Sequence, residues 1–412
     1  MALPVFTPTP QPPPTTHAGY RGPADAASSK RLKADVSDTL LLTEPTTTPA
    51  AFMIGKLRER RTATQFEYTW LEMRPYPRDV SLTVDYAGGN VPGAATSFTM
   101  SAADAAKLTP NMVIRHNDTG QLYLVTSIVG TTVNVLANLG GAGADTGFGP
   151  GTTDEAMAIV NTAYVDGGDI GEPRTVIDQP VSNYCQIFRT PYGFTGRQLN
   201  TEFYGGGDKE VIRRWAAVEH AKSMEWSLFF GKKSLLVDSA TGKLITLTGG
   251  LLDHIKTNIY DVQGNALDEQ NFVNWLEYAM VYGDGGNLNG RGVKYLFASP
   301  NICTDIQYWA AERLRHSVID KQFGLWAEDF ETAHGMVRIV RTPSLRNKYG
   351  SYAFLTDMNH IRYVAHRGRD TKMYEDRQDP GLDADLEEYM SDVGWQVEIE
   401  EAHGAIINYP LS

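Results

Sequence analysis

One helical pattern runs without interruption from Asp208 to Phe230, after three consecutive glycines and before Gly231. At 100° per residue most of its large apolar side chains fall on one face, which Glu219 and Lys222 interrupt. The members of that face are Val211, Ile212, Trp215, Val218, Trp226, Phe229 and Phe230. Asp208 is a typical N-cap and Gly231 a typical stop signal. The pattern predicts a helix about 35 Å long at 1.5 Å per residue, which can act as the spine of a domain with both tryptophans buried.

The composition around this helix is that of a soluble globular protein. The chain has 412 residues, a net charge of -12 and 42% hydrophobic residues, which predicts about two or three domains. Its apolar runs, such as residues 50–54, are far shorter than the ~20 residues needed to cross a bilayer. Residues 1–14 lack the features of a secretory signal, and Cys185 and Cys303 are too few for a disulfide framework. We therefore expect no membrane association and a reducing compartment, most simply a cytoplasm.

The negative charge is concentrated near the C-terminus. Residues 370–401 contain 12 Asp and Glu against Lys372 and Arg377, which is a net charge of -10. Residues 1–61 have eight Lys and Arg against five Asp and Glu, so this part is mildly basic. Binding to DNA phosphates requires clustered positive charge. Neither region supplies it, and sequence-specific nucleic-acid recognition is not expected.

The N-terminal part is rich in proline. Nine of the 21 prolines lie in the first 50 residues, and residues 4–16 are mostly Pro, Thr and Gln. Such a segment is extended or PPII-like and has no core of its own. Composition leaves open whether the first 20 residues are a free tail or an arm that orders on a partner. Apolar residues return after Asp35, and a helix is expected after Pro49.

A change in composition marks residues 80–165 as a separate module. A strand is expected at residues 66–73, and the chain then turns to Gly, Thr, Ala and Val with short alternating runs. Those runs are residues 80–86, 111–115, 122–128 and 132–136, separated by Gly, Asn and Asp turn signals. With its glycine-rich exit at residues 140–151, this region is predicted to be a small all-β module inserted in a larger domain.

The chain beyond the long helix mixes helices and strands. A helix is predicted at residues 268–282, with Phe272, Trp275, Leu276 and Ala279 on its buried face. A buried strand at 293–298 leads through Ser299 as N-cap and Pro300 into a further helix with Ile302, Ile306 and Trp309. Further strands are expected at residues 336–340, 352–356, 360–365 and 395–399. The predicted fold class is α+β with antiparallel pieces.

Two copies of Asp-Thr-Gly, which begin at Asp118 and Asp145, carry the local signature of an aspartic protease. That mechanism needs two carboxylates that share a proton inside an apolar lobe. Asp118 lies in a polar hairpin turn and Asp145 in a glycine-rich loop, so turns are the preferred interpretation.

The other short motifs are also interpreted structurally. The glycines at 205–207 lack P-loop spacing and favour a hinge, and residues 284–290 lack the closing Glu of a calcium loop. Asp357, His360 and His366 could hold a metal, but an exposed polar strand face explains them as well. Neither cysteine has a basic neighbour that would lower its pKa. No catalytic residue, metal ligand or cofactor site is predicted.

The order of these parts resembles that of the major capsid protein of tailed bacteriophages, whose fold is shared with herpesvirus capsid floors. A proline-rich arm precedes a strand, a long β insertion, a spine helix, a mixed domain and a returning strand. The segments that carry the resemblance are VSDTL at 36–40, EPTTTP at 44–49, FEYTW at 66–70, residues 219–230, GMVRIV at 335–340, FLTDMNHI at 354–361 and WQVEIEEAHGA at 395–405. The likeness covers residue 35 to the C-terminus except the β insertion.

The resemblance implies a division of the chain. The implied parts are an N-terminal arm at 1–61, an extended loop at 62–175 carrying the β module at about 80–165, a peripheral domain at 176–262 and 367–412 with the spine helix at about 208–230, and an axial domain at 263–366. Candidate assembly residues are Arg58, Arg60, Arg61, Arg213 and Arg214, with the last two expected on or beside the solvent side of the helix.

The implied function is structural and not enzymatic. Such a protein assembles into the icosahedral head around double-stranded DNA. Its implied partners are its own copies in hexamers and pentamers, a portal, a scaffolding protein or maturation protease, decoration proteins, and packaged DNA through non-specific proximity. It would reside in the virion, and in the host cytoplasm during assembly. The alternatives are a β-rich virion decoration or tail protein that binds calcium or carbohydrate and, more distantly, a hydrolase that uses an Asp-Thr-Gly motif.

Overall fold

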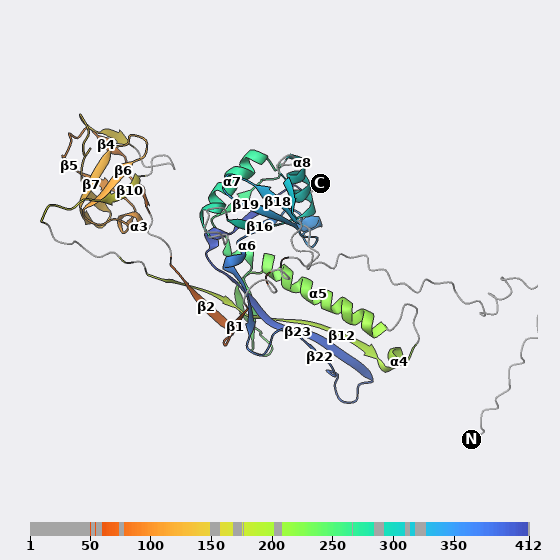
Figure 1. The fold of residues 1–412 in the computed structure, drawn as a ribbon. Coiled ribbons are helices and arrows are strands. Elements are labelled where there is room, and N and C mark those ends of the chain that lie inside the picture. The colour runs from red at the N-terminus through yellow and green to blue at the C-terminus, as the bar shows by residue number, and fades with distance from the viewer. Residues whose placement is uncertain are drawn as a thin grey trace, which may run out of the picture. The chain divides into compact units, whose positions relative to one another are not determined.

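The computed structural model divides the chain into two compact units, one made of residues 1–68 and 183–412 and the other of residues 69–182 (Figure 1). The described residues are 50, 54, 60–73, 78–148, 157–167, 175, 177–201, 208–265, 267–283, 292–309, 314–317 and 327–410. Ala50 and Ile54 are helical, and the rest of the helix predicted after Pro49 lies outside the described residues. The two units are described separately below.

A sheet built on one long strand forms the base of the larger unit. Its strands are β1 (Arg61–Ala63), β21 (Ile361–His366), β23 (Ala384–Val397) and β12 (Gln186–Thr195) in that order, with β22 (Lys372–Tyr374) also paired to β23. β12 and β23 are antiparallel and stay in register over ten pairs. β23 begins well before the strand predicted at 395–399, inside the acidic segment.

The long helix α5 spans Asp208–Phe230, as predicted, and lies along β12 (Figure 1). It ends where Gly231 packs closely: a Cβ there would lie 2.4 Å from the Ser227 carbonyl oxygen and 2.5 Å from that of Thr248. The prediction that Trp215 is buried is wrong, because 50% of it is exposed. The buried positions include Ala216, His220, Leu228 and Phe229, so the helix is rotated relative to the apolar face read from the sequence.

A second sheet of the larger unit has seven strands. Its order is β15 (Ile259–Asp261), β24 (Gly404–Ile407), β20 (Ala353–Thr356), β16 (Val293–Ala298), β19 (Met336–Arg341), β18 (Ala327–Glu331) and β17 (Leu314–Ser317). β16 is parallel to β19 and β15 to β24, and the other pairs are antiparallel. The strands predicted at 293–298, 336–340 and 352–356 match β16, β19 and β20 to within one residue at each end.

Two helices pack on the seven-stranded sheet (Figure 1). α7 (Glu269–Val281) has the predicted N-cap, since Asp268 accepts a hydrogen bond from the Asn271 amide, and it buries Phe272, Trp275, Leu276 and Ala279. α8 (Pro300–Trp309) follows Ser299, whose hydroxyl accepts from the Ile302 amide at 3.4 Å. Both helices contribute to one buried cluster with the strands beneath them.

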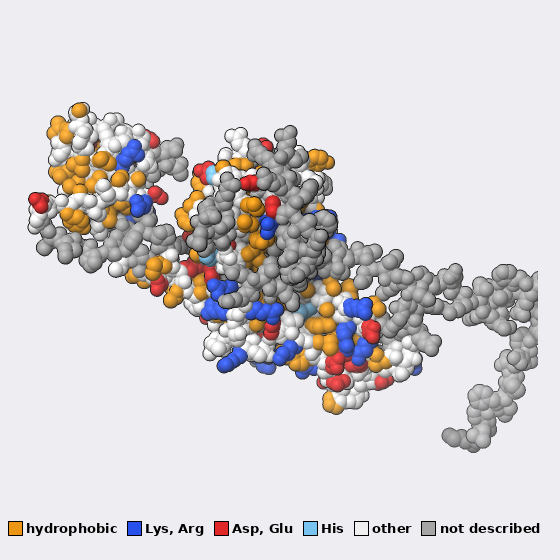
Figure 2. All heavy atoms as spheres, viewed as in Figure 1, with side chains coloured by type: hydrophobic (Ala, Val, Ile, Leu, Met, Phe, Trp, Pro, Cys, Tyr) orange, Lys and Arg blue, Asp and Glu red, His pale blue; other side chains and the backbone are white. Residues whose placement is uncertain are grey.

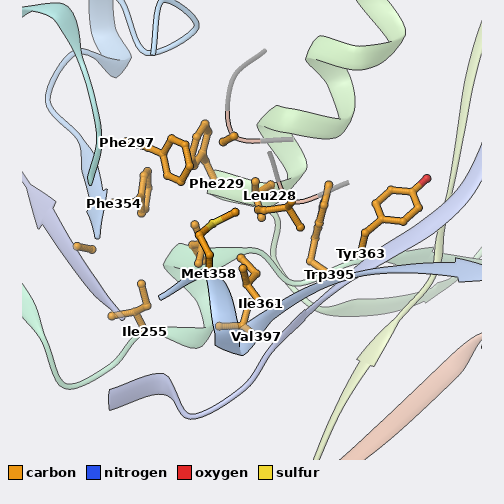
Figure 3. Close-up of a cluster of buried hydrophobic side chains, with 14 of the residues drawn as sticks. Leu228, Phe229, Ile255, Phe297, Phe354, Met358, Ile361, Tyr363, Trp395 and Val397 are labelled. Atoms are coloured by element: carbon orange, nitrogen blue, oxygen red, sulfur yellow. The ribbon is translucent and has the colours of Figure 1, made fainter. Parts of the chain in front are cut away.

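The core beneath α5 joins the two sheets (Figure 3). Phe229 stacks on Phe354 with ring centroids 5.0 Å apart. Trp395 of β23 is 1% exposed and donates its indole N–H to the Ser227 hydroxyl at 3.0 Å. Burial of large aromatic side chains is the main source of stability in such a core, and it holds the C-terminal half of α5 in place.

The remaining elements are short. β2 (Glu67–Glu72), close to the predicted 66–73, pairs with β11 (Gln179–Tyr184), and the boundaries of the two units at residues 68/69 and 182/183 fall within these strands. β13 (Ser234–Val237) and β14 (Leu244–Leu247) form an antiparallel hairpin. The remaining helical turns are α4 (Gly196–Leu199), α6 (Leu251–His254), η1 (Asn347–Tyr349), η2 (Met358–His360) and η3 (Glu400–Ala402).

The smaller unit is mostly β structure with its own core. Its six-stranded sheet has the order β3 (Asp79–Val80), β10 (Met157–Thr162), β6 (Met112–His116), β7 (Leu122–Val129), β8 (Thr132–Leu136) and β5 (Ala95–Thr99). The unit also contains the strand pair β4 (Tyr86–Gly88) and β9 (Thr146–Phe148) and the short helix α3 (Ala102–Ala105). Phe98 and Tyr123 meet edge to face at 5.0 Å in its centre. The single strand predicted at 80–86 is instead broken into β3, an isolated bridge at Leu82 and β4, because the chain bends at residues 83–84.

Candidate assembly site on the spine helix

The first turns of α5 carry two basic side chains that meet acidic side chains of β23. Lys209 and Arg213 are four residues apart and so share a helix face, while Asp385 and Glu387 alternate onto one face of the strand. Lys209 Nζ lies 2.8 Å from Glu387 Oε1 and also pairs with Asp385. Arg213 Nη2 lies 2.5 Å from Glu387 Oε1 and 3.0 Å from Glu375. The helix is thereby held to the sheet by charge as well as by packing.

Glu387 is the centre of this network. Its side chain is fully buried, and burial by itself would raise its pKa. Hydrogen bonds from Arg213, Lys209 and Tyr192 outweigh that effect and hold the pKa of Glu387 at about 2. The Tyr192 hydroxyl donates to Glu387 Oε2 at 2.6 Å, from the position directly opposite in the β12–β23 register. The carboxylate thus stays ionised although it is buried.

A buried histidine lies further along the same interface. The His220 ring nitrogens lie 3.0 Å from the Thr190 hydroxyl and 2.6 Å from the Ser391 hydroxyl. Burial lowers the pKa of His220. His220 can occupy the buried face of α5 because each of its ring nitrogens has a hydroxyl partner.

The arginines proposed from sequence have different surroundings. Arg58 lies outside the described residues. Arg60 pairs with Asp370 at 2.8 Å on the surface, and Arg61 donates to the Gln396 side chain at 2.6 Å. Arg213 is partly exposed, consistent with its expected place on or beside the solvent side, but its guanidinium also pairs with the buried Glu387. Arg214 is exposed, and within the described part of the chain it has no ion-pair partner.

Many of the acidic side chains at residues 370–401 form ion pairs with basic side chains from other parts of the chain or from the segment itself. Besides the pairs at Asp385 and Glu387, Asp392 lies 2.9 Å from Arg369, Glu388 lies 3.3 Å from Arg377, and Glu398 lies 3.0 Å from Arg362. This ion-pair network was not predicted from the sequence. A partial signal was present in the spacing of the charged residues, because bases four positions apart share a helix face and acids two positions apart share a strand face.

The two Asp-Thr-Gly motifs have unlike environments. Asp118 is exposed in a turn, as expected. Asp145 lies in a loop just before β9, as expected, but it is only 5% exposed, and it accepts hydrogen bonds from the Tyr86 hydroxyl and the Asn90 amide. Asp145 therefore stabilises the β4–β9 region, and replacing it by Asn would do more than alter a turn.

The remaining chemical candidates form no site. Asp357 is 1% exposed and accepts from the Asn359 amide as the N-cap of a short helical turn. Among the described residues no group of three or more His, Cys, Asp or Glu side chains is arranged to hold a metal ion. Burial, with a smaller contribution from Asp392, raises the pKa of Cys185 to about 12, so this thiol is not activated. The loops at 205–207 and 284–290 lie outside the described residues.

In the described residues, no helix has the length and hydrophobicity that spanning a membrane would require.

The described residues around α5 form an ion-paired helix on a sheet, with exposed basic and apolar side chains near it. A model of the SU10 major capsid protein family matches residues 16–410. The chain therefore belongs to the SU10 major capsid protein family. It is a non-enzymatic capsid protein of the virion that forms the icosahedral phage head, which confirms the function expected from the sequence.

Comparison with known proteins adds weaker similarities. No curated protein matches the chain. The capsid of a native GTA particle shares 10% identity over 94% of this chain and 99% of its own, with a TM-score of 0.46. Structures from Microbacterium phage Oxtober96 and Mycobacterium phage Bobi each share 10% identity over 95% of this chain and 99% of their own, with TM-scores of 0.45 and 0.46. The family assignment rests on the family model, because TM-scores this low do not establish a common fold.

Proposed function

We propose that the chain builds the head as hexamers and pentamers, with the four parts named above: an arm at 1–61, an extended loop at 62–175 carrying the β module, a peripheral domain at 176–262 and 367–412, and an axial domain at 263–366. The family match over residues 16–410 carries this proposal. In this arrangement extended segments add to neighbouring subunits, and many weak contacts sum over a closed lattice.

An exposed apolar hairpin supports contact between copies. β13 and β14 present Leu235, Leu236, Val237, Leu244 and Ile245, each at least 45% exposed. Leu236 pairs with Ile245 and Val237 with Leu244, on opposite faces of the hairpin. A two-stranded hairpin with apolar residues on both faces is marginally stable alone in water, and such patches mark interaction sites. We propose that a second copy covers it.

The other partners follow from the role and have no contact surface assigned. A portal, a scaffolding protein or maturation protease, and decoration proteins would meet the shell. Packaged DNA would lie near the inner wall without specific binding, because the chain carries a net charge of -12 and phosphate binding requires clustered positive charge.

Electron microscopy of the purified protein tests both parts of this proposal. Wild type is expected to form closed shells or capsomers, whereas Leu236→Asp is expected to leave folded subunits that assemble poorly, because a charge would be buried at every equivalent contact. Leu236→Val keeps an apolar side chain and should assemble like wild type. Normal shells from Leu236→Asp would contradict the hairpin contact, and small discrete oligomers from wild type would contradict the capsid role.

A further inference from the structure

A groove of about 560 Å³ lies between α5 and residues 343–346 of the larger unit. Its walls include Trp215, Glu219 and Trp226 from the helix and Pro343 and Arg346 from the loop. The surface over α5 shows hydrophobic side chains beside charged ones (Figure 2). The groove therefore combines aromatic surface with a polar rim of both charge signs.

The two indoles are arranged as a pair along the helix. Trp215 is 50% exposed, and the half-buried Trp226 meets Tyr349 edge to face at 4.3 Å. Trp215 and Trp226 are eleven positions apart in the helix. At 100° per residue their side chains point within about 20° of the same direction, and their positions are separated by ~16 Å along the helix axis. Within the described part of the chain, neither indole N–H has a hydrogen-bond acceptor, so both are available to a ligand carbonyl.

A proline-rich peptide has the chemistry that suits such a groove. PPII segments dock in aromatic-lined grooves because proline rings pack on indoles and the peptide is already extended. The chain carries such a segment at residues 4–14, and that segment has no charged side chain. In PPII geometry Pro8 and Pro14 share a face and lie ~19 Å apart, close to the separation of the two tryptophans along α5.

The N-terminal arm is anchored in the core on which α5 also packs. Ala50 and Ile54 are buried in the same cluster as Leu228 and Phe229 of α5 and Leu345 of the loop. Residues 15–49 then connect this anchor to the proline-rich segment, a length that reaches at most ~120 Å when fully extended. A covalent connection of this length raises the effective concentration of the segment at the groove of its own subunit. We propose that residues 4–14 dock between Trp215 and Trp226 of their own subunit.

A photo-crosslinking experiment tests this docking in the full-length, unassembled subunit. p-Benzoylphenylalanine replaces Gln11, and an equimolar mixture of ¹⁵N-labelled and unlabelled subunits is irradiated and analysed by peptide mass spectrometry. Crosslinks are expected in the α5 peptides that contain Trp215 or Trp226, and within one isotopic form. Trp215→Ala should lower the yield about tenfold or more, as loss of an aromatic anchor does, while Trp215→Phe retains part of it.

The matched control is Tyr278→Ala, which removes an aromatic residue that is 69% exposed on α7. It should leave the crosslink unchanged, and thermal unfolding of each variant checks that it is folded. Pro8→Ala with Pro14→Ala should lower the yield like Trp215→Ala. A crosslink elsewhere, or one that Trp215→Ala does not reduce, would overturn the proposal. Crosslinks mainly between the two isotopic forms would assign the groove to the arm of a second copy instead. None of these outcomes depends on shell formation.

Discussion

Glu387 shows how a buried carboxylate can stabilise this fold. It accepts hydrogen bonds from three side chains on two elements, and these partners hold its pKa at about 2 against an ordinary value of 4.5. A carboxyl whose pKa is lower in the folded state adds stability that is fully present above its unfolded pKa and is lost as the pH falls through the folded value. The contribution of Glu387 is therefore complete above pH 4.5 and declines toward pH 2.

We expect Glu387→Gln to lower the free energy of unfolding at pH 7 and to differ less from wild type at pH 3. Urea unfolding of the unassembled subunit at both pH values measures this. Glu375→Gln is the matched control, because Glu375 contacts the same arginine but its side chain is 55% exposed, so its effect should be about 1 kcal/mol or less. A difference for Glu387→Gln that stayed constant between the two pH values would show that the exchange of an oxygen acceptor for an amide donor, and not the ionisation of Glu387, is responsible.

At the scale of elements, α5 is held by two kinds of contact. Its C-terminal half packs through Leu228 and Phe229 into the core, and its N-terminal half pairs with β23 through Lys209 and Arg213. Adjacent arginines on this helix therefore have different roles. Arg213 faces the sheet and Arg214 is exposed.

We expect Arg213→Glu to destabilise the subunit by ~3 kcal/mol, because it places a second negative charge beside the buried Glu387. Arg214→Glu should change stability by about 1 kcal/mol or less. Thermal and urea unfolding of the two variants measure this contrast. If Arg214 contacts a neighbouring subunit, its reversal should still reduce shell yield in electron micrographs, and equal destabilisation by both changes would contradict the assignment of Arg213 to the fold.

At the scale of the whole molecule, two regions have little share in the main core. The proline-rich segment at residues 4–16 has a composition that does not build a core of its own, and the smaller unit has a core of its own around Phe98, Ile114 and Tyr123. Regions of this kind can change with limited effect on the rest of a fold.

Deletion of residues 1–33 should leave a folded, soluble subunit whose unfolding temperature is close to that of wild type, because the buried Ala50 and Ile54 are retained. Lattice formation should be impaired. Calorimetry and electron microscopy together check this. A truncated subunit that lost its cooperative unfolding while still assembling would show that the arm belongs to the fold.

Replacement of residues 80–165 by a short Gly and Ser linker should leave the larger unit folded, since closing a surface loop costs little free energy. Circular dichroism and cooperative unfolding of the shortened chain measure this. Loss of all soluble protein would instead indicate that the module supports the main core.

Local signals in the sequence predicted the long helices and some of the strands, but not β12 or most of β23. The ends of α5, the N-cap Asp268 and the strand β16 were predictable because periodicity, capping residues and glycine act over a few neighbouring positions. The order of such elements was also enough to indicate a tailed-phage capsid protein, which the family model bears out.

Only the tertiary structure decided how these elements face one another. The apolar periodicity of α5 put Trp215 in the core, but the helix buries His220 instead, because Thr190 and Ser391 supply hydrogen-bond partners from β12 and β23. The pairing of Arg213 with Glu387 joins residues 174 positions apart. Partners so distant in the chain are brought together by the register of β12 on β23 and the packing of α5 on them. Local spacing shows which side chains share a face of a helix or strand, but it does not show which faces meet.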